Sequence, residues 1–103
     1  MKIIKLLSEL ISEEIKDAEK YANMALQYKE EYPEVAETFH ELSAEEMQHM
    51  NDLHDMVTML ITKYRNEHGE PPEGMMAVYN YLHEKQVDDA MNVKARQMMF
   101  KAD

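Results

Sequence analysis

Three residues able to bind a metal ion interrupt two otherwise apolar helical stripes. In the middle of the chain, the residues that recur at intervals of three and four are apolar except for Glu46 and His49, and the N-terminal stripe contains Glu14. The stripes are Ile4, Leu7, Ile11, Glu14, Ala18, Tyr21, Ala25 and Tyr28, and Phe39, Leu42, Glu46, His49, Leu53, Met56 and Leu60. Such stripes normally face the core of a helical bundle, where an unpaired charge is costly. The pattern therefore predicts that the three residues share a partner such as a metal ion.

Long helices must position these residues, and the composition favours an all-α fold. The chain has only 2 glycines and 3 prolines, and the stretches between them are rich in helix-forming residues. We expect Pro33 in the first turn of the second helix and Gly69 as its C-terminal cap. The expected helices span about residues 3–31, 33–68 and 75–100, with a linker over 69–74.

The short connection at Pro33 predicts that the first two helices pack antiparallel. We expect residues 1–68 to form this hairpin, and 75–103 to complete the same domain or to serve oligomerisation. At about 1.5 Å rise per residue, the three candidate ligands then fall within about 3 to 8 Å of the same height. Two helices alone do not enclose that level. We therefore expect two chains to pair around a twofold axis and form a four-helix bundle.

The Glu-x-x-His spacing alone is weak, because about one match is expected by chance in a chain of this composition. A second match, Glu37 and His40, falls outside the stripe, and we interpret both residues as facing water. A competing interpretation of Glu46 and His49 is a polar layer that only fixes the register of helix pairing. Three ionisable groups exceed what register needs, and no basic residue stands at their level in either stripe.

Two copies of the chain would supply four glutamates and two histidines. This is the ligand set of di-iron carboxylate bundles. Four carboxylates also neutralise two divalent cations, and oxygen ligands with imidazole suit Fe(II) or Mn(II) better than softer metals.

With Tyr21 seven residues after Glu14, and Glu46-x-x-His49 following, the sequence resembles one half of the ferritin-like superfamily, in particular rubrerythrins and bacterioferritins. The stretch AETFHELSAEEMQH, residues 36–49, is similar to the second helix of rubrerythrins. The resemblance covers about residues 3–62. The short half-site format is similar to encapsulated ferritins, which assemble their metal centre between subunits.

The resemblance implies a role for each matching residue. Glu14 corresponds to a terminal carboxylate ligand, Glu46 to the carboxylate that bridges two metals, and His49 to the imidazole ligand. Tyr21 corresponds to a hydrogen-bond donor to a ligand carboxylate. The chain departs from the family in carrying one half-site, so a dimer is required. It also lacks the cysteines of a rubredoxin-type domain, which removes support for classical rubrerythrin peroxidase activity.

Charge and composition exclude several other functions. The net charge of −10 argues against nucleic acid and anionic membranes as partners. The absence of cysteine excludes thiolate and iron–sulfur ligation. Glutamates interrupt the N-terminal apolar run too early for a signal peptide, and no later segment is suited to span a membrane, so we expect a cytoplasmic protein.

The remaining chemically capable residues have simpler interpretations. Most of the 11 methionines are expected to fill the core, although a Met/His copper site is one reading of the run that contains Met47, His49, Met50 and His54. Tyr28 and Tyr79 are interpreted as packing residues. The residues expected at the surface are Glu13, Glu41, Glu45, His54, His68 and His83.

We therefore predict a homodimeric or larger ferritin-like four-helix bundle with two irons per dimer, or manganese in their place. Its ligands are Glu14, Glu46 and His49, and no other catalytic residue is assigned. The implied reaction is oxidation of Fe(II) by dioxygen or peroxide, an oxidoreductase activity of the ferroxidase type. The alternatives are a non-catalytic oligomerisation or adaptor module, and metal binding or storage without turnover.

Overall fold

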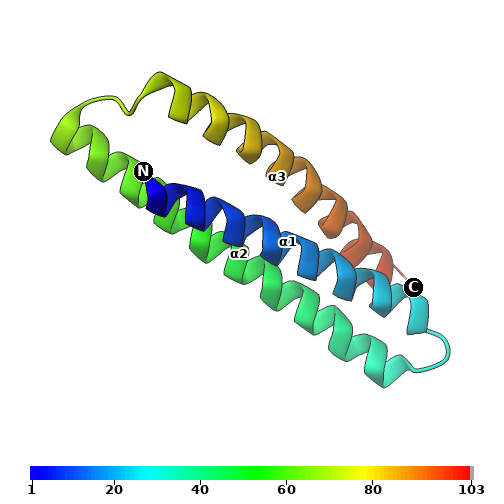
Figure 1. Ribbon diagram of the computed structural model, residues 1–103. Coiled ribbons are helices and arrows are strands. Elements are labelled where there is room, and N and C mark those ends of the chain that lie inside the picture. The colour runs from blue at the N-terminus through cyan, green and yellow to red at the C-terminus, as the bar shows by residue number, and fades with distance from the viewer. Residues whose placement is uncertain (103) are drawn as a thin grey trace.

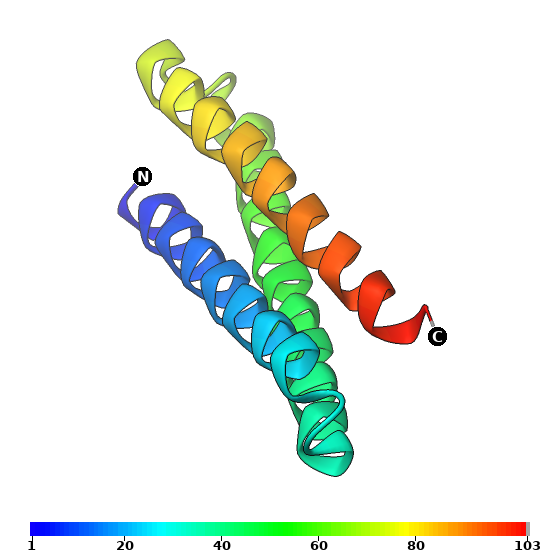
Figure 2. The same ribbon diagram turned by 90° about the vertical axis from the view of Figure 1, so that its right-hand side faces the viewer.

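The computed structural model describes residues 1–102, which form three long α-helices side by side (Figures 1 and 2). They are α1 (Lys2–Tyr28), α2 (Pro33–His68) and α3 (Glu73–Lys101), in a bundle of 55 × 19 × 18 Å. No strand occurs in this part of the chain, and the expectation of an all-α fold is confirmed. Asp103, the last residue of the expected C-terminal element, lies outside the described residues.

The helix ends follow the chemistry of proline and glycine. α1 ends at Tyr28, earlier than expected, and Pro33 begins α2. The proline ring disfavours a helical conformation in the preceding residue, and Tyr32 is non-helical, with φ −134° and ψ 70°. Gly69 caps α2 with a φ of 80°, and its N–H donates to the Arg65 carbonyl at 3.0 Å. α3 starts slightly earlier than expected, directly after Pro72.

The core lies between α1 and the other two helices. α1 presents one face to α2 and the adjacent face to α3, so its buried residues form a broad stripe. The main apolar cluster consists of Ile4, Leu7, Ile11, Ile15, Ala18, Val57, Ile61 and Val93. Within residues 1–102, no helix combines the length and apolarity needed to cross a membrane.

The polar middle of α3 is held on α1 by hydrogen bonds. The Gln86 side-chain amide donates to the Ser8 carbonyl at 3.0 Å and to the Ser12 hydroxyl at 2.9 Å, and Gln86 is buried. A second contact links α3 to α2, where Gln97 donates to the Ser43 hydroxyl at 2.9 Å. These buried polar groups are therefore paired, and they fix the position of α3 on the hairpin.

The predicted stripe on α2 is not the centre of the core within one chain. Val57 and Ile61 are buried between the helices, whereas Leu53 and Leu60 are half-buried and Met56 is exposed. The reason is the third helix, which packs on the opposite side of the hairpin and draws a neighbouring stripe of α2 inward. The predicted stripe is left along an open edge.

Three histidines expected to face water do not. His40 is only 8% exposed, and its ring lies 4.6 Å from that of Phe100 near the end of α3. His54 and His83 are half-buried and stack on each other across α2 and α3. The rings that cover His40 and His54 belong to Phe100 and His83 of α3, whose position the periodicity of α2 does not reveal.

Candidate metal centre

The structure brings Glu14, Glu46 and His49 together near the middle of the hairpin. Glu14 projects from α1, and the other two project from consecutive turns of α2. Successive residues lie about 100° apart around a helix, so Glu14 and Ser12 point to nearly opposite sides of α1. Ser12 bonds to α3. The three residues therefore face away from α3, on the open edge of the hairpin.

Their ligand-type atoms converge closely. One such atom from each side chain lies within 4.8 Å of the others, and among residues 1–102 this is the only group of at least three His, Asp or Glu side chains that does so. The His49 Nδ1 atom lies 3.5 Å from Glu14 Oε2 and 3.7 Å from Glu46 Oε2. These separations are longer than good hydrogen bonds.

The cluster is also unsatisfied. Glu14 Oε2 is buried without a hydrogen-bond partner. No lysine or arginine in the described chain forms an ion pair with Glu14 or Glu46. Two carboxylates and an imidazole thus point at one space with no cation from the protein to balance them, and a metal ion would supply that charge.

The proximity of the two carboxylates alters the acidity of one of them. The pKa of the Glu46 carboxyl is raised above its ordinary value, first because its protonated form can hydrogen-bond to Glu14, and further by burial and by the charge of Glu14. His49 acts in the opposite direction. Without a cation, Glu46 therefore holds its proton more tightly than an isolated glutamate does.

The donor set fits a hard divalent metal, but one chain offers too few ligands to surround it. Two carboxylates with one imidazole suit Fe(II) or Mn(II). The side chains of Glu14 and Glu46 are 26% and 20% exposed, and that of His49 is 56% exposed. The site is therefore open on the side away from the hairpin, where further ligands would have to come from outside the chain.

Apolar side chains flank this open side. Ile3 and Leu6 of α1 and Met56 of α2 are 45%, 49% and 44% exposed. Leu10 and Leu53 lie beside them and are half-buried. We call Ile3, Leu6, Leu10, Leu53, Met56 and Leu60 the hairpin face. Exposed apolar patches of this kind are typical of protein interfaces.

Tyr21 lies on the same edge but forms a different contact from the one that the resemblance implies. Its ring stacks on Phe39, with centroids 6.2 Å apart and planes inclined by 20°. Within the described chain it donates no hydrogen bond to Glu14 or Glu46. Its role as a donor to a ligand carboxylate remains a prediction.

The other candidate residues fall elsewhere. Glu13, Glu41, Glu45 and His68 are exposed, as expected. The accidental Glu37 and His40 match is split, because Glu37 is exposed and His40 is buried. Tyr28 and Tyr79 pack against apolar clusters, and burial raises the pKa of Tyr79.

Sequence reasoning missed the pairing of His54 with His83. The two rings come from consecutive helices, α2 and α3, and the spacing of residues along one helix does not show how it packs against the other. The only available signal was that His54 and the methionines Met47 and Met50 recur on one side of α2.

Most of the chain is similar to a known protein family. The family model described as rubrerythrin matches residues 5–98, most of the chain. No curated protein and no solved structure gives a significant match.

Proposed function

We propose, from the premise that the chain belongs to the rubrerythrin family of the ferritin-like superfamily, that it forms an intersubunit di-metal centre. In this proposal, two copies pair through their hairpin faces into a four-helix bundle. Glu14, Glu46 and His49 of both copies then hold two irons, or manganese in their place. The substrate is Fe(II), and electrons pass from it to dioxygen or peroxide.

The convergence of the three donors is the observation that carries the proposal. Glu14 would act as a terminal ligand, Glu46 as the bridging ligand and His49 as the imidazole ligand. The Nδ1 atom of His49 is the ring nitrogen nearest both carboxylates, which leaves Nε2 for a hydrogen-bond acceptor. The buried, unpartnered oxygen of Glu14 is explained if a metal ion is its partner.

The hairpin face supports the dimer. It places apolar side chains on the same edge as the ligands, so burial of that edge would also enclose the site. Two copies would contribute four carboxylates, which offset the charge of two divalent ions. A metal ion bound there would accept electron density from its ligands and provide an open position for the oxidant.

The residues themselves have defined tasks in this scheme. Glu46 binds a cation in its deprotonated form, so its raised pKa should make metal binding weaker as the pH falls. The apolar side chains of the hairpin face would exclude water from the metal centre. Tyr21 lies seven residues after Glu14 on the same stripe, and we expect it to donate a hydrogen bond to a ligand carboxylate when a second copy covers this edge.

Anaerobic titration with Fe(II), followed by addition of dioxygen, tests the proposal. We expect about one iron per chain, and rapid oxygen consumption when air is admitted. Glu46→Ala should abolish both, because it removes a ligand shared by the two metals. Glu45→Ala is the matched control, since this neighbouring carboxylate is exposed, and it should behave as the wild type.

The possible results of this experiment distinguish the proposed function from its competitors. Binding of iron without oxygen consumption would indicate storage without turnover. A dimer that binds neither Fe(II) nor Mn(II) would indicate an oligomerisation or adaptor module and would overturn the proposed centre.

A further inference from the structure

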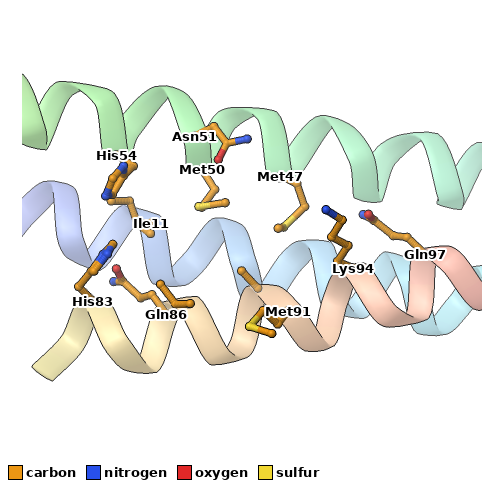
Figure 3. Close-up of a pocket in the computed structure, with 12 residues that line it drawn as sticks. Ile11, Met47, Met50, Asn51, His54, His83, Gln86, Met91, Lys94 and Gln97 are labelled. Carbon is orange, nitrogen blue, oxygen red and sulfur yellow. The ribbon is translucent and has the colours of Figure 1, made fainter.

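A second set of ligand-type side chains lines a groove on the other side of α2. The groove has a volume of about 490 Å³ and lies between α2 and α3, which diverge along part of their length (Figure 3). Its lining contains His54, His83 and three methionines, but no aspartate or glutamate. The donors are therefore of a different chemical type from the carboxylates on the hairpin edge.

Two imidazoles meet at one end of the groove. The rings of His54 and His83 lie 5.0 Å apart with planes inclined by 20°. Tyr79 also stacks on His83, with ring centroids 5.8 Å apart, which restricts the position of that ring. Within residues 1–102 neither imidazole forms a hydrogen bond or an ion pair with another side chain. Their ring nitrogens are thus available to a ligand.

Thioether sulfur atoms complete the lining. Met50 lies one helical turn before His54, and Met47 lies one turn before Met50 on the same side of α2. Met91 projects from α3 and is 64% exposed, and Figure 3 shows the side chains of Met47 and Met50 between the two helices. Met50 is the sulfur closest in register to the histidine pair.

The charge of the groove selects among metals. Imidazole with thioether is a soft donor set, which favours Cu(I) over the hard cations that prefer carboxylates. No carboxylate in the lining would balance a divalent ion, and Lys94 adds a positive charge at the other end. A monovalent ion carries the smaller electrostatic penalty in such a site.

We propose that this groove is a binding site for a soft monovalent metal ion of the Cu(I) type. His54, His83 and Met50 are its ligands, and Met47 and Met91 offer further sulfur atoms. The site is independent of the proposed iron centre, because the two sets of ligands lie on different sides of α2 and share no residue.

Titration of the full-length, metal-free chain with Cu(I) tests the site. The experiment is done without oxygen in the presence of a reductant, with a chromophoric Cu(I) chelator as competitor. Nuclear magnetic resonance of the methionine methyl groups is recorded in parallel. We expect about one Cu(I) per chain and a shift of the Met50 methyl signal, while that of the exposed Met99 stays in place.

Two variants with matched controls assign the ligands. Substitution of a residue that only hydrogen-bonds to a metal ligand lowers metal affinity by roughly 10- to 100-fold. Because His83 is itself a proposed ligand, His83→Asn should lower the affinity at least as much. Met50→Leu keeps the volume of the side chain and should also weaken binding. His68→Asn and Met99→Leu alter exposed residues away from the groove and should leave the affinity unchanged.

The wild-type titration decides the matter even if a variant fails to fold. A chain that takes no Cu(I) from the competitor, or that binds it without moving the Met50 signal, would overturn the site. Retention of full affinity by folded His83→Asn would do the same. Loss of Cu(I) binding in Glu46→Ala alone would show that the copper had bound to the hairpin edge instead.

Discussion

Glu46 is the residue whose chemistry depends most on its neighbours. Its pKa is raised, first by the hydrogen bond that its protonated form makes to Glu14. The folded chain therefore binds this proton more tightly than the unfolded chain does. It follows that the metal-free protein is more stable when Glu46 is protonated, and that stability declines as the pH rises from the unfolded to the folded pKa. Above that window the loss is constant.

A neutral side chain in place of Glu46 should remove the contribution of this residue to the pH dependence of stability. We expect Glu46→Gln to raise the free energy of unfolding of the metal-free protein at neutral pH by less than about 1 kcal/mol, the range for partly exposed charges. The measurement is urea denaturation between about pH 4 and pH 7, which spans the ordinary glutamate pKa. Glu45→Gln is the control. An unchanged slope of stability against pH would contradict the assignment.

Residue spacing was sufficient to predict that Glu14, Glu46 and His49 come together, because each lies at a recurring position on a long helix. Spacing did not reveal the stacking of Tyr21 on Phe39, since both stripes permit many side-chain orientations. Nor did it reveal the pair formed by His54 and His83. Contacts between helices depend on how a third element docks, which one helix does not encode.

At the level of elements, the two ends of α2 were the most predictable feature. Proline and glycine act through local sterics, so Pro33 and Gly69 mark a start and an end regardless of what packs around them. The packing of α3 was less predictable, because its apolar residues do not form one stripe. Val78, Tyr81 and Met91 are more than half exposed, while Gln86 is buried.

The two glycines offer a test with opposite signs. Gly69 has φ 80° and ψ −161°, a region open almost only to glycine, so Gly69→Ala should destabilise by about 1–3 kcal/mol. Gly74 lies in the first turn of α3, where an added methyl group meets nothing within 4 Å. Gly74→Ala should therefore stabilise by about 0.5–1 kcal/mol. Thermal unfolding of both variants provides the comparison. Equal effects would contradict this description of the α2 cap.

At the scale of the whole molecule, the hairpin has two apolar sides and α3 covers one of them. The other is the hairpin face, on the same edge as the candidate ligands. From the sequence, both stripes were expected to face a single core. A helix that packs on two sides carries apolar residues around more of its circumference, and spacing alone does not divide them between the two sides. Only the position of α3 distinguishes the side that is buried within the chain from the side that stays exposed.

Charge placed on the hairpin face should separate the copies. Met56 is 44% exposed in one chain, so Met56→Glu should cost that chain little stability and should shift the protein from dimer toward monomer. Its iron content should fall with the dimer. Tyr81→Glu is the control, because Tyr81 is 69% exposed on α3. Sedimentation velocity measures the result, and a Met56→Glu variant that stays dimeric would argue against this interface.

Anomalous diffraction at the iron edge, from crystals loaded anaerobically with Fe(II), tests the proposed centre most directly. We expect two iron positions beside a twofold axis, each contacted by glutamate oxygens and a His49 nitrogen, with ligands from both copies. Iron absent from this edge, or bound by the residues of one copy with no second chain nearby, would contradict a shared centre.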